Sequence, residues 1–265
     1  MNSILFDIGA TKTRIAYSVD GEIFETPEVF ETPQIYEEGL KLFVATAKKL
    51  ANARVIKKIA GGMSRSIADW TPEKFKDDLQ KIFGADVFIE NDAAIVGLGE
   101  ANWGAGRGFN IVAYITVSTG VGGAKIVNGQ IDERAIGFEP GKQIIDIDGG
   151  SNKTLEDLIS GKALIAKTGK HPKEITDENI WDEHAKMLAI GLNNIIVEWS
   201  PNCVVLGGSM IIGNPAISLE KTKTYLKEIL TIFPELPIIK KAELGDFGGL
   251  YGALAYLKNL YIIKV

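Results

Sequence analysis

The chain of 265 residues is 46% hydrophobic and 24% charged, an ordinary balance for a globular enzyme built as one large domain or two small ones. Its net charge of −5 argues against nucleic acid or an anionic membrane as the main partner, and we expect neither a secretory signal nor a transmembrane segment. The single cysteine, Cys203, allows no internal disulfide and no zinc cluster, so a reducing, cytoplasmic setting is expected.

The first part of the chain predicts alternating strands and helices. A hairpin is expected at Asp20-Gly21, and Thr71 followed by Pro72 is typical of a helix start. The expected strands cover residues 4–8, 14–19, 22–30, 55–60 and 86–90. The expected helices cover residues 35–53, residues 72–83, and a segment from Asn91 or Asp92 to Trp103.

The same layout restarts at residue 110. Segment 114–131, with its Gly-rich bend and its Asn128-Gly129 hairpin signal, echoes segment 4–23, and CVVLGG at 203–208 predicts a buried parallel strand. The other expected elements are helices at 154–166, 179–199, 215–231 and 247–260, and a strand at 237–243. We therefore expect an α/β protein of two similar lobes, residues 1–106 and 107–265, with a cleft between them and with the last helix able to pack back on the first lobe.

Each copy of the repeat contains a bend rich in small residues between two strands. Such a bend offers glycines for close backbone approach and hydroxyls and amides as donors. The candidate nucleotide-binding residues are Asp7, Gly9, Thr11, Lys12 and Thr13 in the first bend, and Thr119, Gly120 and Gly122 in the second. Two facing bends would grip a chain of phosphates, and Asp7 could hold a hydrated Mg²⁺. The alternative is that both bends are tight hairpins with glycines at positive φ.

Two further segments combine a strand end with residues suited to chemistry. Asp92 could act as a general base and Asn91 could bind a substrate hydroxyl, although Asp and Asn are also favoured helix N-caps. Gly207 and Gly208 follow a buried strand, where an adenosine would fit because ligands bind at the carboxyl ends of parallel strands. Strand-Gly-Gly-helix joints also occur for packing reasons alone.

Five segments in chain order carry a family resemblance: FDIGATKT (6–13), FIENDAAIVGLGEANWGAGRG (88–108), ITVSTGVGGAKIVNGQI (115–131), VVLGGSM (204–210) and LGDFGGLYGALAYL (244–257). With them the chain resembles the ROK family (repressor, open reading frame, kinase) of sugar kinases, within the actin-like ATPase superfamily. The resemblance implies two ribonuclease-H-like lobes, ATP with Mg²⁺ in the cleft, and transfer of the γ-phosphoryl group to a sugar hydroxyl. It implies Asp92 as the base, Asn91 as a sugar ligand, both bends at the phosphates, and Gly207 and Gly208 at the adenosine.

The sequence departs from the family pattern around the expected sugar site. Where the family has Glu-x-Gly-His, this chain has Glu139-Pro140-Gly141-Lys142, so Glu139 is kept and Lys142 replaces the histidine. The cysteine-rich zinc loop of the family is replaced by residues 147–154, which contain no cysteine, so structural zinc is not expected. Glu156 matches a family glutamate that binds sugar, but it would equally suit the first turn of a helix capped by Thr154. Residues 60–71, which include Gly62, are shorter than the family segment that covers the sugar.

The sequence-based hypothesis is an ATP-dependent carbohydrate kinase, with glucose or another hexose as the acceptor suggested by family analogy. One alternative is a catalytically weak or inactive sugar- or nucleotide-binding protein of the same fold. The family's repressors carry a helix-turn-helix before the first strand, so a repressor is not expected. Another alternative is an actin-like kinase that acts on an amino sugar or a non-sugar acid. A homodimer would agree with the resemblance, and His171 and His184 are expected at the surface.

Overall fold

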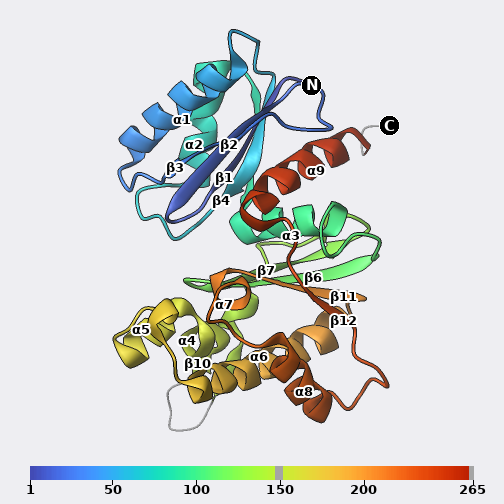
Figure 1. The fold of residues 1–265 in the computed structure, drawn as a ribbon. Helices are drawn as coiled ribbons and strands as arrows, with labels where there is room; N and C mark the ends of the chain where they lie inside the picture. Colours follow the sequence, from blue (N-terminus) through green and yellow to red (C-terminus); the bar gives the residue numbers. More distant parts are fainter. Residues whose placement is uncertain (147–151, 263–265) are drawn as a thin grey trace. The chain divides into compact units, whose positions relative to one another are not determined.

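The computed structural model describes residues 1–146 and 152–262, and it divides into two compact units (Figure 1). Unit 1 consists of Met1–Trp103 and Leu244–Val265, and unit 2 consists of Gly104–Glu243. Each unit contains a five-stranded sheet with helices, so the predicted α/β class is confirmed. Within the described ranges, no helix is long and apolar enough to cross a membrane.

The sheet of unit 1 has the strand order β3-β2-β1-β4-β5. Strand β1 pairs antiparallel with β2 and parallel with β4, which in turn pairs parallel with β5. The bounds are β1 (Ser3–Ile8), β2 (Lys12–Ser18), β3 (Glu28–Glu31), β4 (Lys58–Met63) and β5 (Asp86–Asn91).

The sheet of unit 2 repeats this topology. Its order is β12-β11-β6-β7-β8, in which β6 pairs antiparallel with β7 and parallel with β11, as β1 does with β2 and β4. The bounds are β6 (Ile111–Val117), β7 (Val121–Val127), β8 (Gln130–Ile131), β11 (Cys203–Gly207) and β12 (Ile238–Lys241). The repeat seen in the sequence is therefore a repeat of supersecondary structure.

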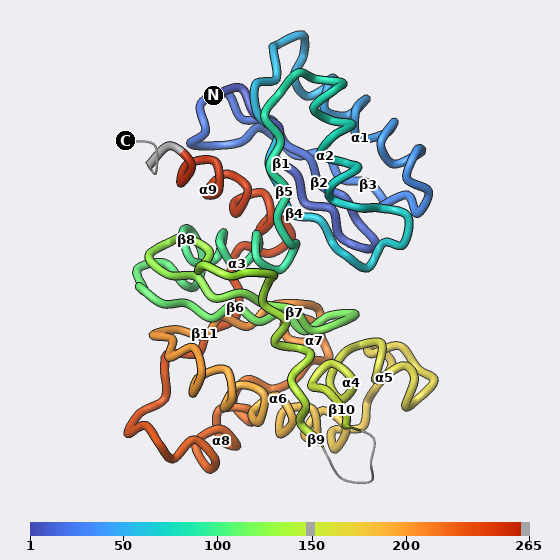
Figure 2. The backbone as a smooth tube through the Cα atoms, turned by 180° about the vertical axis from the view of Figure 1, so that it is seen from behind, coloured from blue at the N-terminus to red at the C-terminus, as the bar shows by residue number. Residues whose placement is uncertain are grey.

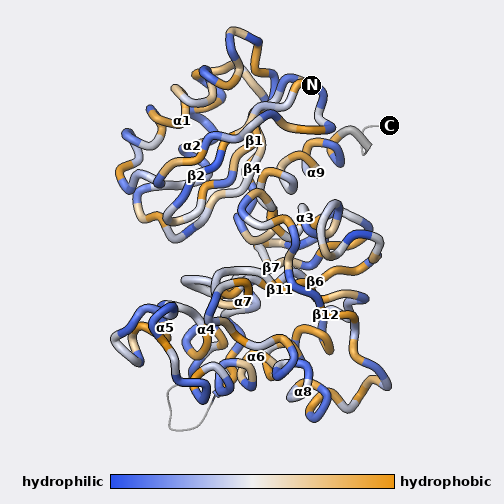
Figure 3. Tube along the Cα trace, in the orientation of Figure 1, coloured by the Kyte–Doolittle hydropathy of each residue, from blue (hydrophilic) through white to orange (hydrophobic). Residues whose placement is uncertain are grey.

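In unit 1, alternate residues of the strands feed two separate cores, because successive side chains of a strand point to opposite faces. Phe6 and its same-face neighbours pack against α1 (Tyr36–Ala51) and α2 (Pro72–Phe83), which lie on one side of the sheet in Figures 1 and 2. Leu5 packs on the other face against α9 (Gly248–Ile262). Figure 3 shows α1 alternating between hydrophilic and hydrophobic residues, the pattern of a helix with one buried face.

Helix α3 (Asp92–Asn102) crosses α9 at glycines that allow the two backbones to touch. A Cβ at Gly252 would lie 1.7 Å from the carbonyl oxygen of Ile95, and one at Gly99 would lie 2.4 Å from that of Gly248. Substitution at either glycine would drive the helices apart. The crossing therefore fixes the position of the α3 N-terminus within unit 1.

In unit 2, the helices cover one face of the sheet, and β6 and β11 supply the apolar side chains beneath them. The helices are α4 (Leu155–Ile159), α5 (Gly161–Thr168), α6 (Glu178–Trp199), α7 (Ser209–Ile212) and α8 (Leu219–Ile229). Two short strands, β9 (Ile144–Asp146) and β10 (Lys153–Thr154), form a separate ribbon, and the 3₁₀ turns are η1 (Pro140–Lys142), η3 (Pro172–Glu174) and, in unit 1, η4 (Gly245–Phe247). Segment 147–154 replaces the zinc loop of the family, and its residues 147–151 lie outside the described residues, so the absence of structural zinc stays a prediction.

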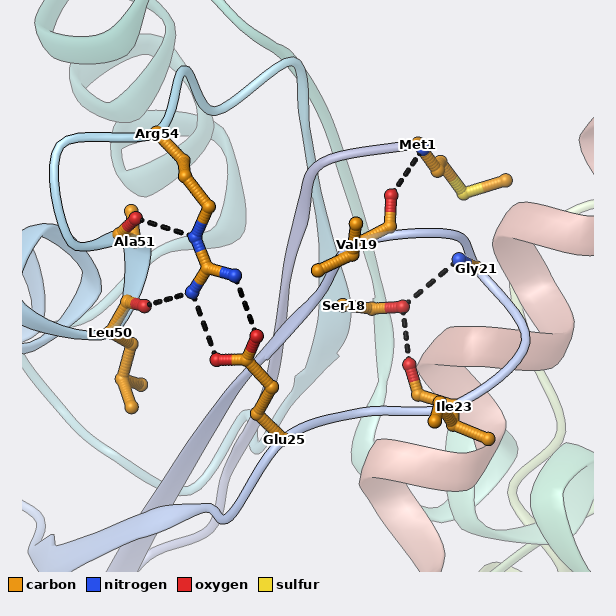
Figure 4. A network of polar contacts seen from close by, with 9 residues as sticks. All are labelled: Met1, Ser18, Val19, Gly21, Ile23, Glu25, Leu50, Ala51 and Arg54. Atoms are coloured by element: carbon orange, nitrogen blue, oxygen red, sulfur yellow. Dashed lines mark hydrogen bonds and ion pairs between the residues drawn. The ribbon is translucent and has the colours of Figure 1, made fainter.

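The strand predicted at 22–30 was wrong at residues 22–27, because only residues 28–31 pair with β2. Figure 4 shows the reason: the hydroxyl of Ser18 donates to the Ile23 carbonyl at 2.5 Å and accepts from the Gly21 amide at 3.0 Å, which closes the chain into a loop. Pro27, which has no amide hydrogen, then stands just before β3. Arg54 holds this loop from the other side through two bonds to Glu25, at 2.6 and 2.9 Å.

Three further elements differ from the sequence-based expectation by more than one or two residues at an end. The strand expected at 55–60 is β4 at Lys58–Met63, because the Gly61-Gly62 pair continues the strand instead of turning. The helix expected at 154–166 is two helices, since Ser160 ends α4 and caps α5 by accepting from the Ala163 amide at 3.1 Å. The helix expected at 215–231 begins only at Leu219, after Ser218 as its cap.

The surface placement of His184 was also wrong. Its side chain is buried on α6 beside the Trp181 ring, because α6 presents this face to the unit 2 core. Nδ1 lies 2.7 Å from the Ile180 carbonyl oxygen, and Nε2 has no hydrogen-bond partner among the described residues. Burial lowers the pKa of this imidazole, so it is held neutral. His171, the other histidine, is exposed as expected.

Candidate functional site

The first bend joins β1 to β2, and Thr32, which follows β3, holds it through two hydrogen bonds. The Thr32 hydroxyl donates to the Gly9 carbonyl at 2.8 Å, and its amide donates to the Thr11 carbonyl at 3.0 Å. Gly9 closes the bend by donating its amide to the Lys12 carbonyl at 3.0 Å. Thr11 and Lys12 are exposed, and the amides of Ala10 and Thr11 have no acceptor among the described residues. The bend thus offers amides, a hydroxyl and an ammonium group to an anion.

Thr13, predicted as part of the nucleotide site, is buried at the start of β2. Its hydroxyl lies 2.9 Å from that of Thr32. Because Thr32 already donates its hydroxyl hydrogen to Gly9, Thr13 is the donor in this contact. The structure thus gives Thr13 a part in holding the bend, and no direct role at a ligand is assigned to it.

Asp7 forms a buried charge pair with Arg14, its direct partner across β1 and β2. The guanidinium of Arg14 lies 3.4 Å from Asp7 and 3.1 Å from Asp246, in η4. Gly249, in the first turn of α9, brings its backbone so close that an added Cβ would lie 2.5 Å from the Asp7 carboxyl carbon. Burial raises the pKa of Asp7 to about 7, while the Arg14 charge opposes this shift and Asp92 adds to it. Arg14 was missed in the sequence, although its position opposite Asp7 across the bend was a usable signal.

Asp92 begins α3, and its neighbour Asn91 is the N-cap, as the alternative interpretation of this segment predicted. The Asn91 side-chain oxygen accepts from the Ala94 amide at 3.1 Å, which leaves its NH₂ group to act as a donor to a ligand. One Asp92 carboxylate oxygen accepts from the Ala93 amide at 2.9 Å. Burial raises the pKa of Asp92, and this amide together with the Ser64 hydroxyl lowers it in part.

Gly62, expected near the sugar, lies in β4 directly against Asp92. A Cβ at this position would lie 2.9 Å from the Asp92 Cα and 3.2 Å from the Ile95 Cβ. Beyond β4, the Ser64 hydroxyl lies 2.8 Å from that of Ser66, and the Arg65 charge acts on Asp92. Ser64 follows β4 where β4 meets β5, so the sheet register brings it to Asp92, and no local sequence signal could have found it.

The second bend, Ser118–Gly120, joins β6 to β7 in unit 2. Thr119 is exposed and Gly120 is half-buried. The start of α5 holds the bend, since the Gly161 amide donates to the Ser118 carbonyl at 2.7 Å and the Lys162 amide donates to the Thr119 carbonyl at 3.3 Å. Gly122, the third predicted residue of this bend, lies within β7 and is half-buried.

Gly207 and Gly208 bring the end of β11 close to the same bend. Gly208 has φ of +88°, and a Cβ there would lie 2.3 Å from the Val117 carbonyl oxygen, so only glycine fits. A Cβ at Gly207 would lie 2.6 Å from the Tyr114 hydroxyl. The tight joint starts α7 beside the bend, where the hydroxyls of Ser209 and Ser118 lie 3.3 Å apart.

A cavity of about 270 Å³ lies in unit 2 beside this bend. Its polar rim includes Ser118 and Thr119 of the bend, and its walls come from α5, η3 and the segment after α7. The lining residues that make the cavity partly polar and partly apolar are Lys162, Ile165, His171, Pro172, Met210 and Pro215. None of these six was predicted as a site residue, because they come from two segments about fifty positions apart that only tertiary packing unites.

Three of the residues that the resemblance associates with sugar, Glu139, Lys142 and Glu156, lie around the end of the second bend. Glu156 occupies the first turn of α4, and Thr154 caps that helix as the alternative interpretation predicted. One Glu156 oxygen accepts from the Val121 amide at 2.9 Å, and the other accepts from Lys142 Nζ at 2.6 Å. Glu139, just before η1, is exposed, and its charge contributes to raising the pKa of Lys142.

Asp7 is the predicted metal ligand, and its surroundings suit a hydrated Mg²⁺ ion. Magnesium is usually bound through one or two carboxylates together with substrate phosphates, and a second carboxylate, Asp92, is close enough to raise the pKa of Asp7. In residues 1–146 and 152–262 no group of three or more His, Cys, Asp or Glu could form an all-protein cage. Any Mg²⁺ at Asp7 would therefore need further ligands from outside the chain, and a metal at this position stays a prediction.

Two sheets of equivalent order, each with a bend of small residues after its first strand, define an actin-like ATPase fold. The sequence profile of the ROK family matches residues 4–259, and the chain belongs to this family.

The similar proteins include enzymes and a regulator. The N-acetyl-D-glucosamine kinase of Mannheimia succiniciproducens is 29% identical, over 94% of this chain and 97% of that protein. The ROK hexokinase from Thermus thermophilus has a structure that matches with a TM-score of 0.79 at 25% identity, over 98% of this chain and 100% of that one. The xylose repressor of Bacillus spizizenii is 29% identical, over 57% of this chain and 44% of the repressor. With this repressor and two other curated relatives, the match spans only about half of the relative's length.

Proposed function

We propose that this chain is an ATP-dependent carbohydrate kinase that transfers the γ-phosphoryl group to a hydroxyl of a hexose or an N-acetylhexosamine. Its similarity to a full-length N-acetyl-D-glucosamine kinase and to a ROK hexokinase supports this reaction class. The observation that carries the proposal is the environment of Asp92: a half-buried carboxylate at a helix start, oriented by the Ala93 amide and the Ser64 hydroxyl.

Asp92 is proposed as the general base. Phosphoryl transfer asks a protein chiefly for positioning and charge stabilisation, and a carboxylate then accepts the proton of the attacking hydroxyl. A pKa raised by burial brings a carboxylate closer to the operating pH, which favours proton transfer. The NH₂ group of Asn91 would donate to an acceptor hydroxyl while its oxygen caps α3.

The donor ATP is proposed to use the second bend and the adjoining cavity of unit 2. Amides and hydroxyls of the bend would hold phosphate oxygens, and the apolar walls around Ile165 and Met210 would hold the adenosine. Gly9, Thr11 and Lys12 of the first bend offer the same kind of donors to phosphate. Mg²⁺, held through Asp7, would neutralise charge on the transferred phosphoryl group.

The decisive experiment measures acceptor-dependent release of ADP from Mg-ATP over a panel of hexoses, N-acetylhexosamines and sugar acids. The Asp92→Asn variant should lose about 10²- to 10⁴-fold in kcat, the range typical of a general base. Asp86→Asn, at an exposed aspartate in β5, the strand that leads into α3, serves as the matched control and should retain activity. Turnover that survives in Asp92→Asn would refute the assignment of the base.

A second candidate is a sugar-binding protein without catalytic turnover. The similarity to a xylose repressor favours it, as does the pairing of Glu156, implied as a sugar ligand, with the chain's own Lys142. Calorimetric binding of a sugar from the panel, with no ADP release above the blank, would support this candidate. Sugar acids belong in the acceptor panel because the positive charge of Arg65, which acts on Asp92, would also attract the carboxylate of such a sugar.

A further inference from the structure

Unit 2 contains a closed set of contacts at the exit of the second bend. Val121, the first residue of β7, donates its amide to Glu156 Oε2 at 2.9 Å. The other Glu156 oxygen accepts from Lys142 Nζ at 2.6 Å. Lys142 belongs to η1, whose Gly141 packs so tightly on Val121 that an added Cβ would lie 2.2 Å from the Val121 carbonyl oxygen. Glu156 of α4 thus contacts both the end of the second bend, at Val121, and η1, at Lys142.

Glu156 also lies directly beneath the bend itself. A Cβ at Gly120 would lie 2.7 Å from Glu156 Oε2. The Glu156 carboxylate therefore packs directly against the backbone of the second bend, which is proposed to bind phosphate. A negative charge in this place would repel a polyphosphate unless a cation compensates it. Lys142 supplies that cation, and the contact with Glu156 raises its pKa, so it stays protonated at neutral pH.

Stability alone does not account for the pair. The Lys142 side chain is 58% exposed and that of Glu156 is 28% exposed, and ion pairs so close to solvent contribute little to folding. The amide-carboxylate bond is different, because a charge-assisted bond to a backbone N–H fixes the bend geometrically. The effect of the pair should therefore appear in the affinity for an anion at the bend.

We infer that Glu156 and Lys142 are positioning residues for the phosphate donor. Glu156 holds the end of the second bend through the Val121 amide. Lys142 holds the Glu156 side chain in place and cancels its charge beside the donor phosphates. This inference rests on the proposed function, because it takes the second bend as the place where the nucleotide phosphates bind.

The test compares binding of the non-hydrolysable ATP analogue AMP-PNP, measured by calorimetry without acceptor, in four variants. Lys142→Met leaves an uncompensated carboxylate and should weaken binding by about three- to tenfold at low salt, less at high salt. Glu156→Gln keeps an oxygen for the Val121 amide and leaves the Lys142 charge uncompensated, so it should bind at least as tightly as the wild type. The double variant Lys142→Met/Glu156→Gln should recover the affinity that Lys142→Met loses. Lys186→Met, at an exposed lysine on α6, is the matched control.

Three outcomes would overturn the inference: a double variant as weak as Lys142→Met, a Lys142→Met variant with unchanged affinity, or a Glu156→Gln variant that raises only the KM for the acceptor. If the wild type does not bind AMP-PNP, the proposed function fails in its own right. Hydrogen exchange of the Val121 amide still tests the contact in that case. Glu156→Ala should lose its protection and Glu156→Gln should keep most of it, and equal protection in both would overturn the inference.

Discussion

Replacing Gly62 by alanine should slow catalysis as well as destabilise the protein. The added methyl would lie 2.9 Å from the Asp92 Cα, about half an ångström inside ordinary contact distance. Helix α3 cannot retreat, because its Ile95 carbonyl already touches the α9 backbone at Gly252, where an added Cβ would lie only 1.7 Å away. The overpacking should cost about 1–3 kcal/mol in the free energy of unfolding. A displaced base should lower kcat by about 10- to 100-fold.

Gly84→Ala is the matched control for this prediction. Gly84 ends α2 at a φ of +62°, and an added Cβ would meet nothing within 4 Å. Alanine in that left-handed conformation should cost about 1–2 kcal/mol, comparable with the cost at Gly62, but far from Asp92. Urea unfolding and steady-state kinetics at a temperature where both variants are folded would separate the two effects. A Gly62→Ala variant with a kcat no lower than that of Gly84→Ala would refute the argument that β4 positions the base.

Three other predictions concern charged groups. Arg14→Gln leaves Asp7 without its buried partner, so the carboxyl takes up a proton, and thermal or urea unfolding should show a loss of about 1–3 kcal/mol. Ser64→Ala removes a hydrogen bond that lowers the pKa of Asp92, so the acidic limb of the kcat/KM profile should move to higher pH. His184 has a pKa lowered by burial, so its contribution to stability is complete above pH 6.5, its ordinary pKa, and is lost as the pH falls below it. The loss should reach at most about 1.4 kcal/mol per pH unit, and His184→Gln should abolish it.

Each of these predictions has its own control. Asp246→Asn removes the exposed partner of Arg14 and should change the free energy of unfolding by less than about 1 kcal/mol. An Arg14→Gln variant as stable as Asp246→Asn would contradict the buried pair. An unchanged acidic limb in Ser64→Ala would exclude the hydroxyl as a partner of Asp92. His171→Gln, at the exposed histidine, should keep the acid-dependent loss, and its disappearance there would remove His184 as the cause.

Local sequence patterns predicted much of the fold because they report local chemistry. The small-residue bends, the Thr71 cap and the start of α3 at Asp92 are each specified by residues within one turn of chain. The repeat was visible because each strand pair and its bend form a hairpin, whose register is set by the turn. The cross-strand pair of Asp7 and Arg14 follows from the same register and could have been found.

The errors occurred where distant residues decide a local conformation. The strand expected at 55–60 ended before Gly61 and Gly62, but both glycines lie in β4, where Phe6 and Asp92 leave no room for side chains. Ser160 breaks an apparently continuous helical pattern, and the break lets the Gly161 amide reach the carbonyl of Ser118. The polar neighbours of His184 suggested exposure, yet the face of α6 that it shares with Trp181 packs on the sheet.

The sequence by itself determined the repeated α/β layout, the positions of the two small-residue bends and the family. These features rest on turn chemistry and on short motifs in a fixed order along the chain. Only the tertiary structure decided which groups surround the motif residues. It brought Ser64 to Asp92 through the sheet register, and it paired Glu156 with Lys142 and Val121. The physical reason is that burial, charge pairing and close backbone approach depend on segments far apart in the chain, and no local pattern records which of them will meet.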